Sequence, residues 1–336
     1  MLEKCRPTCR ASLYGAPASS CFALIFMLAC IVLVDAQAQN GGAARRAPAT
    51  TAALAENVDV VQVASDVYMI GGGGSNVTVH VGPQGLFVVD TGSAAASAKI
   101  VAAIRSISDK PIRYIANTSA DPDHIGGNVE VNKLGEAIKS REVIDEHASI
   151  VAYQTVLDRL SAAGQPPAVP AAAWPTSTFT TPQQDFAFNN QAIQLFHRPA
   201  AHTDGDVVVF FRRSDVVAAG DVFDKTRYPV IDVAKGGSIN GEIDAINWLL
   251  DLIVPGEKEE GGTMVVPGHG RLCDESEVME YRDMLTIVRD RVKDMVDKGM
   301  TLQQVKAAKP TFEYDPEYGP SDAFVEAVFR GLQVKR

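Results

Sequence analysis

Cysteine is scarce in this chain and is confined almost entirely to its N-terminal end. Four of the five cysteines lie within the first 30 residues, and only Cys273 lies beyond them. Once the N-terminal segment is removed, no second cysteine remains, so an internal disulfide is excluded even in an oxidising compartment. The folded part must therefore be stabilised by a hydrophobic core, which a domain of about 280 residues is large enough to bury.

Basic residues are also in the minority. The chain has 31 Lys and Arg against 41 Asp and Glu, and its formal net charge is −10. A nucleic-acid-binding protein needs a basic face, so this balance argues against a nucleic-acid partner. This charge balance neither favours nor excludes a small-molecule substrate, and it says nothing about the oligomeric state.

The longest apolar run lies near the N-terminus. Three basic residues precede this run at 21–34, and Ala36-Gln37-Ala38 follows it as a small-x-small cleavage signal. The run is shorter than the roughly 20 residues that a membrane-spanning helix needs. Residues 1–38 are therefore predicted to be a signal peptide, and the mature chain is expected in the periplasm or secreted, without stable membrane contact. An uncleaved N-terminal anchor is the alternative, because the segment before the apolar run is long.

The rest of the chain alternates between apolar strands and amphipathic helices after a linker. Residues 39–57 lack hydrophobic periodicity and are predicted to be flexible; 58–300 are predicted to form one α/β domain, and 301–336 a C-terminal helical extension. Residues 130–160 have helical character, and the prolines of 164–183 favour a surface loop or a lid. The main expected strands are 58–63, 67–70, 76–81, 86–89, 112–116, 192–196, 207–211, 216–219 and 264–266, and the main expected helices are 93–107, 242–253 and 274–299.

Three of the six histidines lie where a site would form. His124, His202 and His269 each occupy a Gly- or Asp-rich loop beside an apolar strand. Strand ends in layered α/β folds are where functional side chains converge. The remaining histidines are interpreted as surface or core residues and are excluded from the site: His80, His147 and His197.

The segment before the first of these histidines is rich in oxygen ligands. Ser119, Asp121 and Asp123 alternate along the chain before His124, so they are expected on one side. The Gly126-Gly127 pair that follows gives the backbone a wider range of conformations. Carboxylate and imidazole ligands together suit Zn²⁺, and Fe²⁺ or Mn²⁺ accept the same set.

Five short motifs, in this order, resemble those of the metallo-β-lactamase superfamily: VVDTG, DHIGGN, AHTDGD, AGD and VPGHG, between about Val58 and His269. The resemblance implies a four-layer αββα sandwich and a metal-dependent hydrolase that acts on a small molecule. It further implies that metal-bound hydroxide attacks an ester, thioester, lactone or amide carbonyl.

The same resemblance implies the roles of individual residues. The family pattern H-x-H-x-D-H is replaced here by S-A-D-P-D-H, in which Ser119 and Asp121 stand where the family has histidines. Asp123 is expected to orient the nucleophile, and Asp90 to be a supporting carboxylate rather than a ligand. The implied ligands of the first metal are Asp123, His124, Asp221 and His269, and those of the second are Asp121, His202 and Asp221, completed by Ser119 or water.

The two implied metal positions are expected to differ in their affinity for a metal ion. The first keeps all its side chains and should bind tightly, whereas the second has lost neutral nitrogen ligands and gained negative charge, so it should be weaker or empty. One or two Zn²⁺ ions are therefore expected. The loop at 224–240 offers Lys225, Arg227, Tyr228 and Ser238, but loop residues of this kind are expected to be solvated, and no substrate-binding residue is assigned.

Two other functions fit the same motifs. The missing histidines motivate a non-catalytic metal-binding or ligand-binding protein on the same scaffold, since a fold does not fix a function. A mononuclear iron dioxygenase shares the fold and the retained ligands.

Overall fold

The fold is seen in a computed structural model that describes residues 58–138, 146–162, 169–256 and 261–333. The predicted signal peptide and the whole of the predicted linker lie outside these residues. No helix within the described ranges has the length and hydropathy of a membrane-spanning segment.

The first sheet combines an antiparallel and a parallel half. Its strands are hydrogen-bonded in chain order from β1 to β7, antiparallel as far as β4 and parallel from there on. Parallel strands are buried on both faces, which agrees with the continuous apolar run of the fourth strand. The strands are β1 (Asp59–Gln62), β2 (Val67–Gly71), β3 (Val77–Gly82), β4 (Gly85–Val89), β5 (Ile112–Ala116), β6 (Ser149–Tyr153) and β7 (Ser177–Phe179).

The second sheet has the strand order β12-β11-β10-β9-β8. Only the β11–β12 pair is parallel. Its strands are β8 (Gln183–Phe188), β9 (Gln191–Arg198), β10 (Asp206–Phe211), β11 (Val216–Asp224) and β12 (Met264–His269).

Helices cover the outer face of each sheet. The helices beside the first sheet are α1 (Ser97–Ile107), α2 (Pro122–Ile125), α3 (Asn128–Asn132) and α4 (Gln154–Leu160), with the short 3-10 helix η1 (Ala171–Ala173). Those that follow β11 are η2 (Val233–Lys235), α5 (Ile239–Leu252), α6 (Glu275–Asp297), α7 (Leu302–Ala307), α8 (Asp315–Tyr318) and α9 (Asp322–Gln333).

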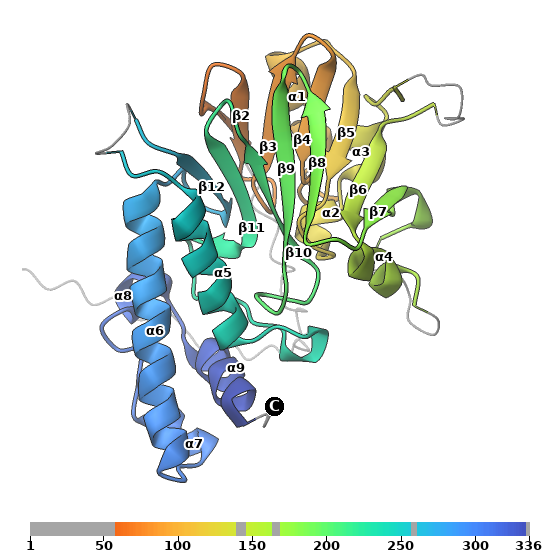
Figure 1. The fold of residues 1–336 in the computed structure, drawn as a ribbon. Coiled ribbons are helices and arrows are strands. Elements are labelled where there is room, and N and C mark those ends of the chain that lie inside the picture. The colour runs from red at the N-terminus through yellow and green to blue at the C-terminus, as the bar shows by residue number, and fades with distance from the viewer. Residues whose placement is uncertain (1–57, 139–145, 163–168, 257–260, 334–336) are drawn as a thin grey trace, which may run out of the picture. The chain divides into compact units, whose positions relative to one another are not determined.

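Alternating side chains of the strands build separate cores. In β4, Phe87 packs between the two sheets, whereas Leu86 packs against α1. In β10, Val207 likewise points between the sheets and Val208 toward the helices on the other side. This two-sided burial gives the order helix, sheet, sheet, helix and confirms the predicted four-layer αββα sandwich (Figure 1).

The residues predicted as a C-terminal extension belong to the second helical layer. Val305, Tyr318 and Phe324 share one core with buried residues of α5 and α6. The helix α6 begins at a capping box formed by Asp274 and Glu277, as predicted from their spacing. The three C-terminal helices therefore add to the core behind the second sheet.

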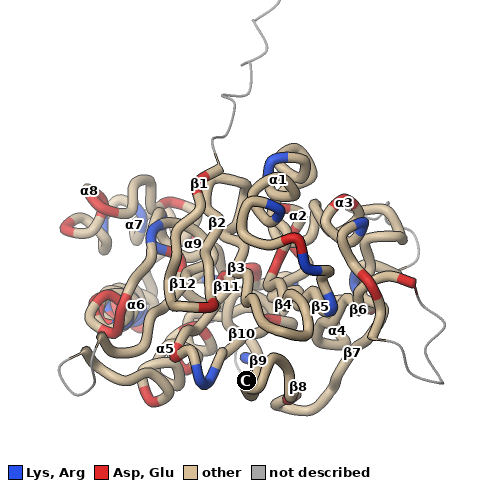
Figure 2. The backbone as a smooth tube through the Cα atoms, turned by 90° about the horizontal axis from the view of Figure 1, so that it is seen from above, with Lys and Arg blue, Asp and Glu red and all other residues tan. Residues whose placement is uncertain are grey.

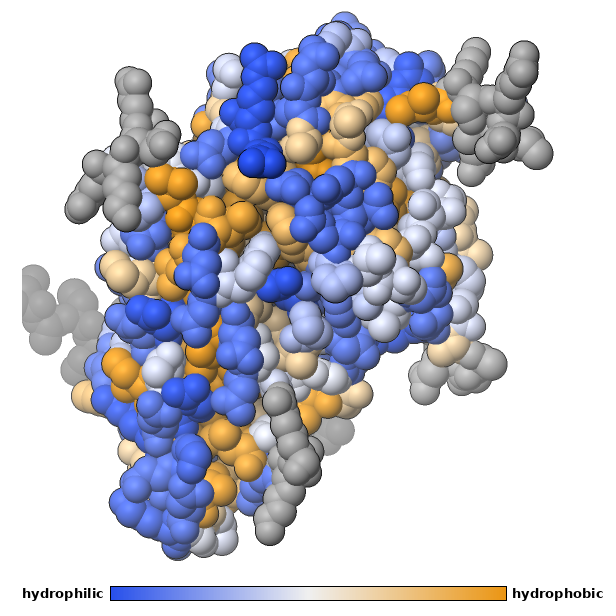
Figure 3. All heavy atoms as spheres, in the orientation of Figure 1, coloured by the Kyte–Doolittle hydropathy of each residue, from blue (hydrophilic) through white to orange (hydrophobic). Residues whose placement is uncertain are grey.

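The surface of the described residues is mixed in character. Lys and Arg are interspersed with Asp and Glu along the backbone (Figure 2). The face in Figure 3 is mostly hydrophilic, with patches of hydrophobic residues among the hydrophilic ones.

The helical prediction for residues 130–160 is wrong at 149–153 and holds at 154–160, where α4 forms, while 139–145 lie outside the described residues. A buried strand, β6, crosses this range and pairs in parallel with β5. A short apolar run such as SIVAY fits a buried strand as well as a buried helix, so periodicity alone could not separate them.

The region 164–183 is more regular than predicted. It contains η1 and β7, and β8 begins at its end. The strand β8 was not expected, although the two residues that join it to β9, Asn189 and Asn190, both have positive φ (52° and 63°). Asparagine tolerates this left-handed conformation, and such a two-residue turn closes a hairpin.

Candidate metal centre

The segment after β5 carries three of the six predicted site residues. Asp121 is the N-cap of α2 and has an extended backbone, Pro122 opens the helix, and Asp123 and His124 lie in its single turn. Because the chain turns into a helix at Asp121, the strand-like alternation expected for Ser119, Asp121 and Asp123 does not form. The two carboxylates lie in different groups of ligand atoms, in the division that the resemblance implies.

The first group consists of Asp123, His124 and His269, whose ligand atoms lie within 4.8 Å of one another. Nε2 of His269 lies 3.3 Å from Oδ2 of Asp123. The carboxylate of Asp221 contacts this group as well, since Nε2 of His124 is 3.0 Å from its Oδ2 and Nε2 of His269 is 3.5 Å from its Oδ1. The structure thus brings together the four residues expected to hold the first metal.

Two nitrogen atoms of this group are buried and have no hydrogen-bond partner. They are Nε2 of His124 and Nε2 of His269. The carboxylate oxygens near them lie at ion-pair distance but outside hydrogen-bond geometry. Unpartnered imidazole nitrogens that converge with carboxylates are the donor set of a divalent cation such as Zn²⁺, so the residues fit the metal that the resemblance implies.

The imidazole of His124 is held in place from behind by Asp90. Its Nδ1 lies 2.8 Å from Oδ2 of Asp90, which also accepts a hydrogen bond from the Thr118 hydroxyl at 2.6 Å. The other oxygen of Asp90 accepts from the backbone N–H of Thr118 at 2.8 Å. A carboxylate in this position fixes the tautomer and directs Nε2 toward the ligand group. Asp90 therefore lies behind a ligand, as expected from the sequence.

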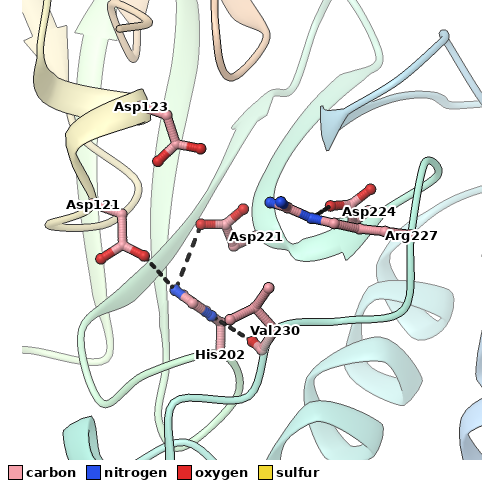
Figure 4. A pocket seen from close by; sticks show the side chains of 7 residues that line it. All are labelled: Asp121, Asp123, His202, Asp221, Asp224, Arg227 and Val230. Atoms are coloured by element: carbon pink, nitrogen blue, oxygen red, sulfur yellow. Dashed lines mark hydrogen bonds and ion pairs between the residues drawn. The ribbon is translucent and has the colours of Figure 1, made fainter. Parts of the chain in front are cut away.

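The second group consists of Asp121, His202 and Asp221. Nε2 of His202 lies 2.9 Å from Oδ2 of Asp121 and 3.7 Å from Oδ2 of Asp221, while its Nδ1 faces the carbonyl oxygen of Val230 at 2.5 Å (Figure 4). Ser119 does not join this group. Its hydroxyl is buried and accepts a hydrogen bond from the backbone N–H of Asp121, so the described residues offer no fourth side chain in place of the missing histidine.

Asp221 lies within β11 rather than in the loop after it. The register between β11 and β12 shifts on both sides of Gly220, which has a φ of 54°. A Cβ atom at Gly220 would lie 2.7 Å from the side chain of Thr118. The strand was therefore predicted too short because a bulge, which requires glycine here, interrupts its pairing before Asp221.

Both groups open into one pocket of about 230 Å³ (Figure 4). The carboxylates of Asp121, Asp123 and Asp221 point into it from α2 and β11, and Arg227 faces them from the other side. Arg227 is an exposed loop residue, as expected, and it also forms part of the pocket wall. The pocket is lined by Asp121, Asp123, His202, Asp221, Asp224, Arg227 and Val230.

One contact of the second group was not foreseen from the sequence. Nζ of Lys235 lies 3.1 Å from Oδ1 of Asp121. The only signal in the sequence is the Gly236-Gly237 pair that follows, which permits a close approach of the backbone.

The carboxylates raise the pKa of every histidine in the centre. Burial opposes the charged form of His202, but Asp121 and Asp221 outweigh it and raise its pKa to about 10. Burial also opposes the charged form of His269, whose pKa is raised to about 9 by Asp123 and Asp221. For His124, Asp221 and Asp90 outweigh burial and raise the pKa well above its usual value. The carboxylates therefore create a negative potential that attracts a proton or a metal ion.

The comparison with known families agrees with this geometry. The sequence model of the metallo-beta-lactamase superfamily matches residues 70–270, which is more than half of the chain. The chain therefore belongs to the metallo-β-lactamase superfamily, as its ordered motifs predict. Members of this superfamily generally bind divalent metal ions, and the predicted enzyme class, a metal-dependent hydrolase, is confirmed at the level of the superfamily.

Among curated proteins, the chain is similar to a linear primary-alkylsulfatase from Pseudomonas sp. It is 26% identical to that protein over 298 residues, which cover 74% of this chain and 54% of the relative. The chain thus spans about half the length of this relative.

Solved structures share the fold. The stereoselective inverting sec-alkylsulfatase Pisa1 from Pseudomonas sp. matches with a TM-score of 0.62 and 14% identity, covering 81% of this chain and 50% of that one. A metallo-beta-lactamase from Pontibacter korlensis matches with a TM-score of 0.53 and 18% identity, covering 68% of this chain and 99% of that one.

Metal binding to the first group is expected to release protons. Because the pKa of His269 is about 9 and that of His124 lies well above 6.5, both imidazoles are protonated at pH 7 in the metal-free protein, and a divalent cation can bind only their neutral forms. The apparent affinity for Zn²⁺ should rise with pH until it levels off above about 9. Calorimetric titrations in buffers with different ionisation enthalpies should show at least one proton released per Zn²⁺ at pH 7.

The exposed His147 provides a control. His147→Gln should leave the proton release unchanged, whereas His269→Gln should lower it. A heat of binding that does not depend on the buffer would contradict the prediction.

Proposed function

We propose that this chain is an exported metal-dependent hydrolase that cleaves an ester bond, and that alkyl sulfate esters are its substrate class. The observation that carries the proposal is the first ligand group, where two unpartnered imidazole nitrogens and two carboxylates lie beside a pocket. Carboxylic esters, thioesters, lactones and amides remain substrates to compare. The similarity to the alkylsulfatase of Pseudomonas sp. supports the sulfate ester.

The proposed ligands of the metal are Asp123, His124, His269 and Asp221. Zn²⁺ suits this set of two imidazoles and two carboxylates, and Fe²⁺ or Mn²⁺ are compatible with it. When bound, a divalent cation supplies Lewis-acid chemistry, since it lowers the pKa of water and stabilises negative charge that develops in the transition state.

Asp123 is proposed to orient the attacking water and to accept its proton. Its side chain projects into the pocket and is 39% exposed, unlike that of Asp221, which is 11% exposed (Figure 4). His269 contacts one of its oxygens at 3.3 Å and so restrains its orientation. A carboxylate held in this way can position a water molecule on the side of the pocket where the substrate enters.

Arg227 is proposed to bind the sulfate group. Its Nε donates a hydrogen bond to Oδ2 of Asp224 at 2.9 Å, and 48% of its side chain is exposed. The guanidinium therefore has further N–H groups that can face the pocket. A planar fork of N–H donors matches two oxygens of an oxyanion, and the positive charge balances that of a sulfate ester.

Replacing Asp123 should abolish turnover while the fold is kept. Asp123→Asn retains the shape of the side chain but cannot accept the proton, so kcat should fall by about 10²–10⁴-fold. The measurement is the steady-state hydrolysis of an alkyl sulfate by Zn²⁺-loaded protein, beside carboxylic ester, thioester, lactone and β-lactam substrates.

Asp290, an exposed residue of α6, gives the matched control. Asp290→Asn should leave kcat within twofold of the unchanged protein. If the metal-loaded protein hydrolyses none of these substrates, the result favours the non-catalytic metal-binding alternative.

Replacing Arg227 should raise KM for sulfate esters more than KM for neutral esters. Arg227→Gln removes a charge-assisted contact worth about 1.5–3 kcal/mol, so KM for an alkyl sulfate should rise about 10–100-fold. KM for a neutral carboxylic ester should change far less. Arg212→Gln, on the exposed turn after β10, is the control and should change neither value. Equal effects of Arg227→Gln on both substrates would argue against sulfate binding at this residue.

Export is proposed from the N-terminal segment and can be tested on the full chain. After expression in a bacterium, mass spectrometry of the exported fraction should find a mature protein that begins at Gln39. Ala38→Arg, which places a large charged residue at the cleavage position, should prevent processing. An intact chain that remains with the membrane would support the uncleaved anchor instead.

A further inference from the structure

The ammonium group of Lys235 contacts the second ligand group. It ends η2, in the segment between β11 and α5. Its Nζ lies 3.1 Å from Oδ1 of Asp121 and 3.0 Å from Oδ2 of Asp232. The ammonium group therefore bridges two carboxylates, and one of them belongs to the metal centre.

Both oxygens of Asp121 are engaged by groups of this chain. Oδ1 accepts from Lys235, and Oδ2 lies 2.9 Å from Nε2 of His202. Asp121 replaces a neutral histidine of the family pattern and so adds one negative charge to the second position. The ammonium group of Lys235 places one positive charge beside it, which offsets part of this added negative charge and is shared with Asp232.

The backbone holds Lys235 firmly in this place. Its carbonyl oxygen accepts hydrogen bonds from the backbone N–H of Asp204 at 3.0 Å and from the guanidinium of Arg159 at 2.9 Å. Two residues later, a Cβ atom at Gly237 would lie 2.1 Å from the carbonyl oxygen of His202. One closely packed turn therefore positions both the lysine and the histidine of the second group.

The second group has three candidate ligands, Asp121, His202 and Asp221, of which one is not its own. Asp221 is shared with the first group, Ser119 does not reach it, and His202 is its single imidazole. A protein zinc site ordinarily has three or four protein ligands. A divalent cation on Asp121 would further be repelled by the ammonium group beside it.

We propose that the ammonium group of Lys235 takes the place of a second metal ion, so that the centre binds one divalent cation, in the first group. The inference rests on the metal centre proposed above and deepens it, because it explains how the chain keeps the Asp121 position without a second ion. Lys235 acts here as a positioning residue that neutralises Asp121 and holds it against His202.

The test is the number of metal ions per chain. Purified protein is dialysed to equilibrium against a tenfold molar excess of Zn²⁺, and bound zinc is measured by inductively coupled plasma mass spectrometry. The unchanged protein should bind one ion per chain. Lys235→Met, which removes the ammonium group but keeps most of the side-chain volume, should bind two, and Lys235→Arg, which keeps the charge, should bind one.

The control is Lys298→Met, which removes a lysine from an exposed ion pair with Asp294 and should bind one ion. Two ions in the unchanged protein would overturn the proposal and leave the hydrolytic function untouched. A folded Lys235→Met variant that still binds one ion would also overturn it. Binding of no metal at all would instead overturn the metal centre on which both proposals rest.

A second measurement does not depend on the variants. Crystals of the unchanged protein soaked in Zn²⁺ should show one anomalous-scattering peak, among Asp123, His124, His269 and Asp221. A second peak between Asp121 and His202 would overturn the proposal even if Lys235→Met fails to fold.

Discussion

The centre depends on one buried carboxylate, that of Asp221, which lies within reach of three histidines. Its oxygens are 3.0 Å from Nε2 of His124, 3.5 Å from that of His269 and 3.7 Å from that of His202. These histidines come from α2, from the end of β12 and from the segment between β9 and β10, so a single charge ties together segments that leave both sheets. Without it, each imidazole would keep only one carboxylate neighbour, and the negative potential that attracts a cation would be weaker.

The sequence predicted the residues of the centre better than their arrangement. Ordered motifs identified every carboxylate and histidine of the two ligand groups. This was possible because the position of each motif relative to the neighbouring apolar strand can be read from the local sequence. The resemblance assigned Asp121 and Asp123 to different groups, but it did not predict the helical turn that begins at Pro122 between them. The four layers followed from the resemblance and from strands that are apolar on both faces, such as β4 and β10.

What the sequence could not predict was decided by tertiary packing. The strand β6 has the same apolar character as a buried helix, and only its pairing with β5 distinguishes the two. The contact between Lys235 and Asp121 joins residues that are 114 positions apart. It arises because the turn before α5 packs on the carbonyl of His202, a contact with no local signature. Arg227 is an exposed loop residue, as expected, but its place in the pocket wall could not be predicted, because that depends on the residues opposite it.

Asp90 combines a left-handed backbone conformation with a carboxylate that contacts two side chains. Its backbone has a φ of 58°, which glycine, asparagine and aspartate tolerate best, and its carboxylate accepts from both His124 and Thr118. Glycine at this position would relieve the backbone strain but lose the acceptor of both hydrogen bonds. Glutamate would keep a carboxylate but strain the backbone. Asparagine would offer one acceptor oxygen where the structure uses two. Each of these single replacements at position 90 therefore forfeits either the backbone conformation or one of the contacts that hold His124.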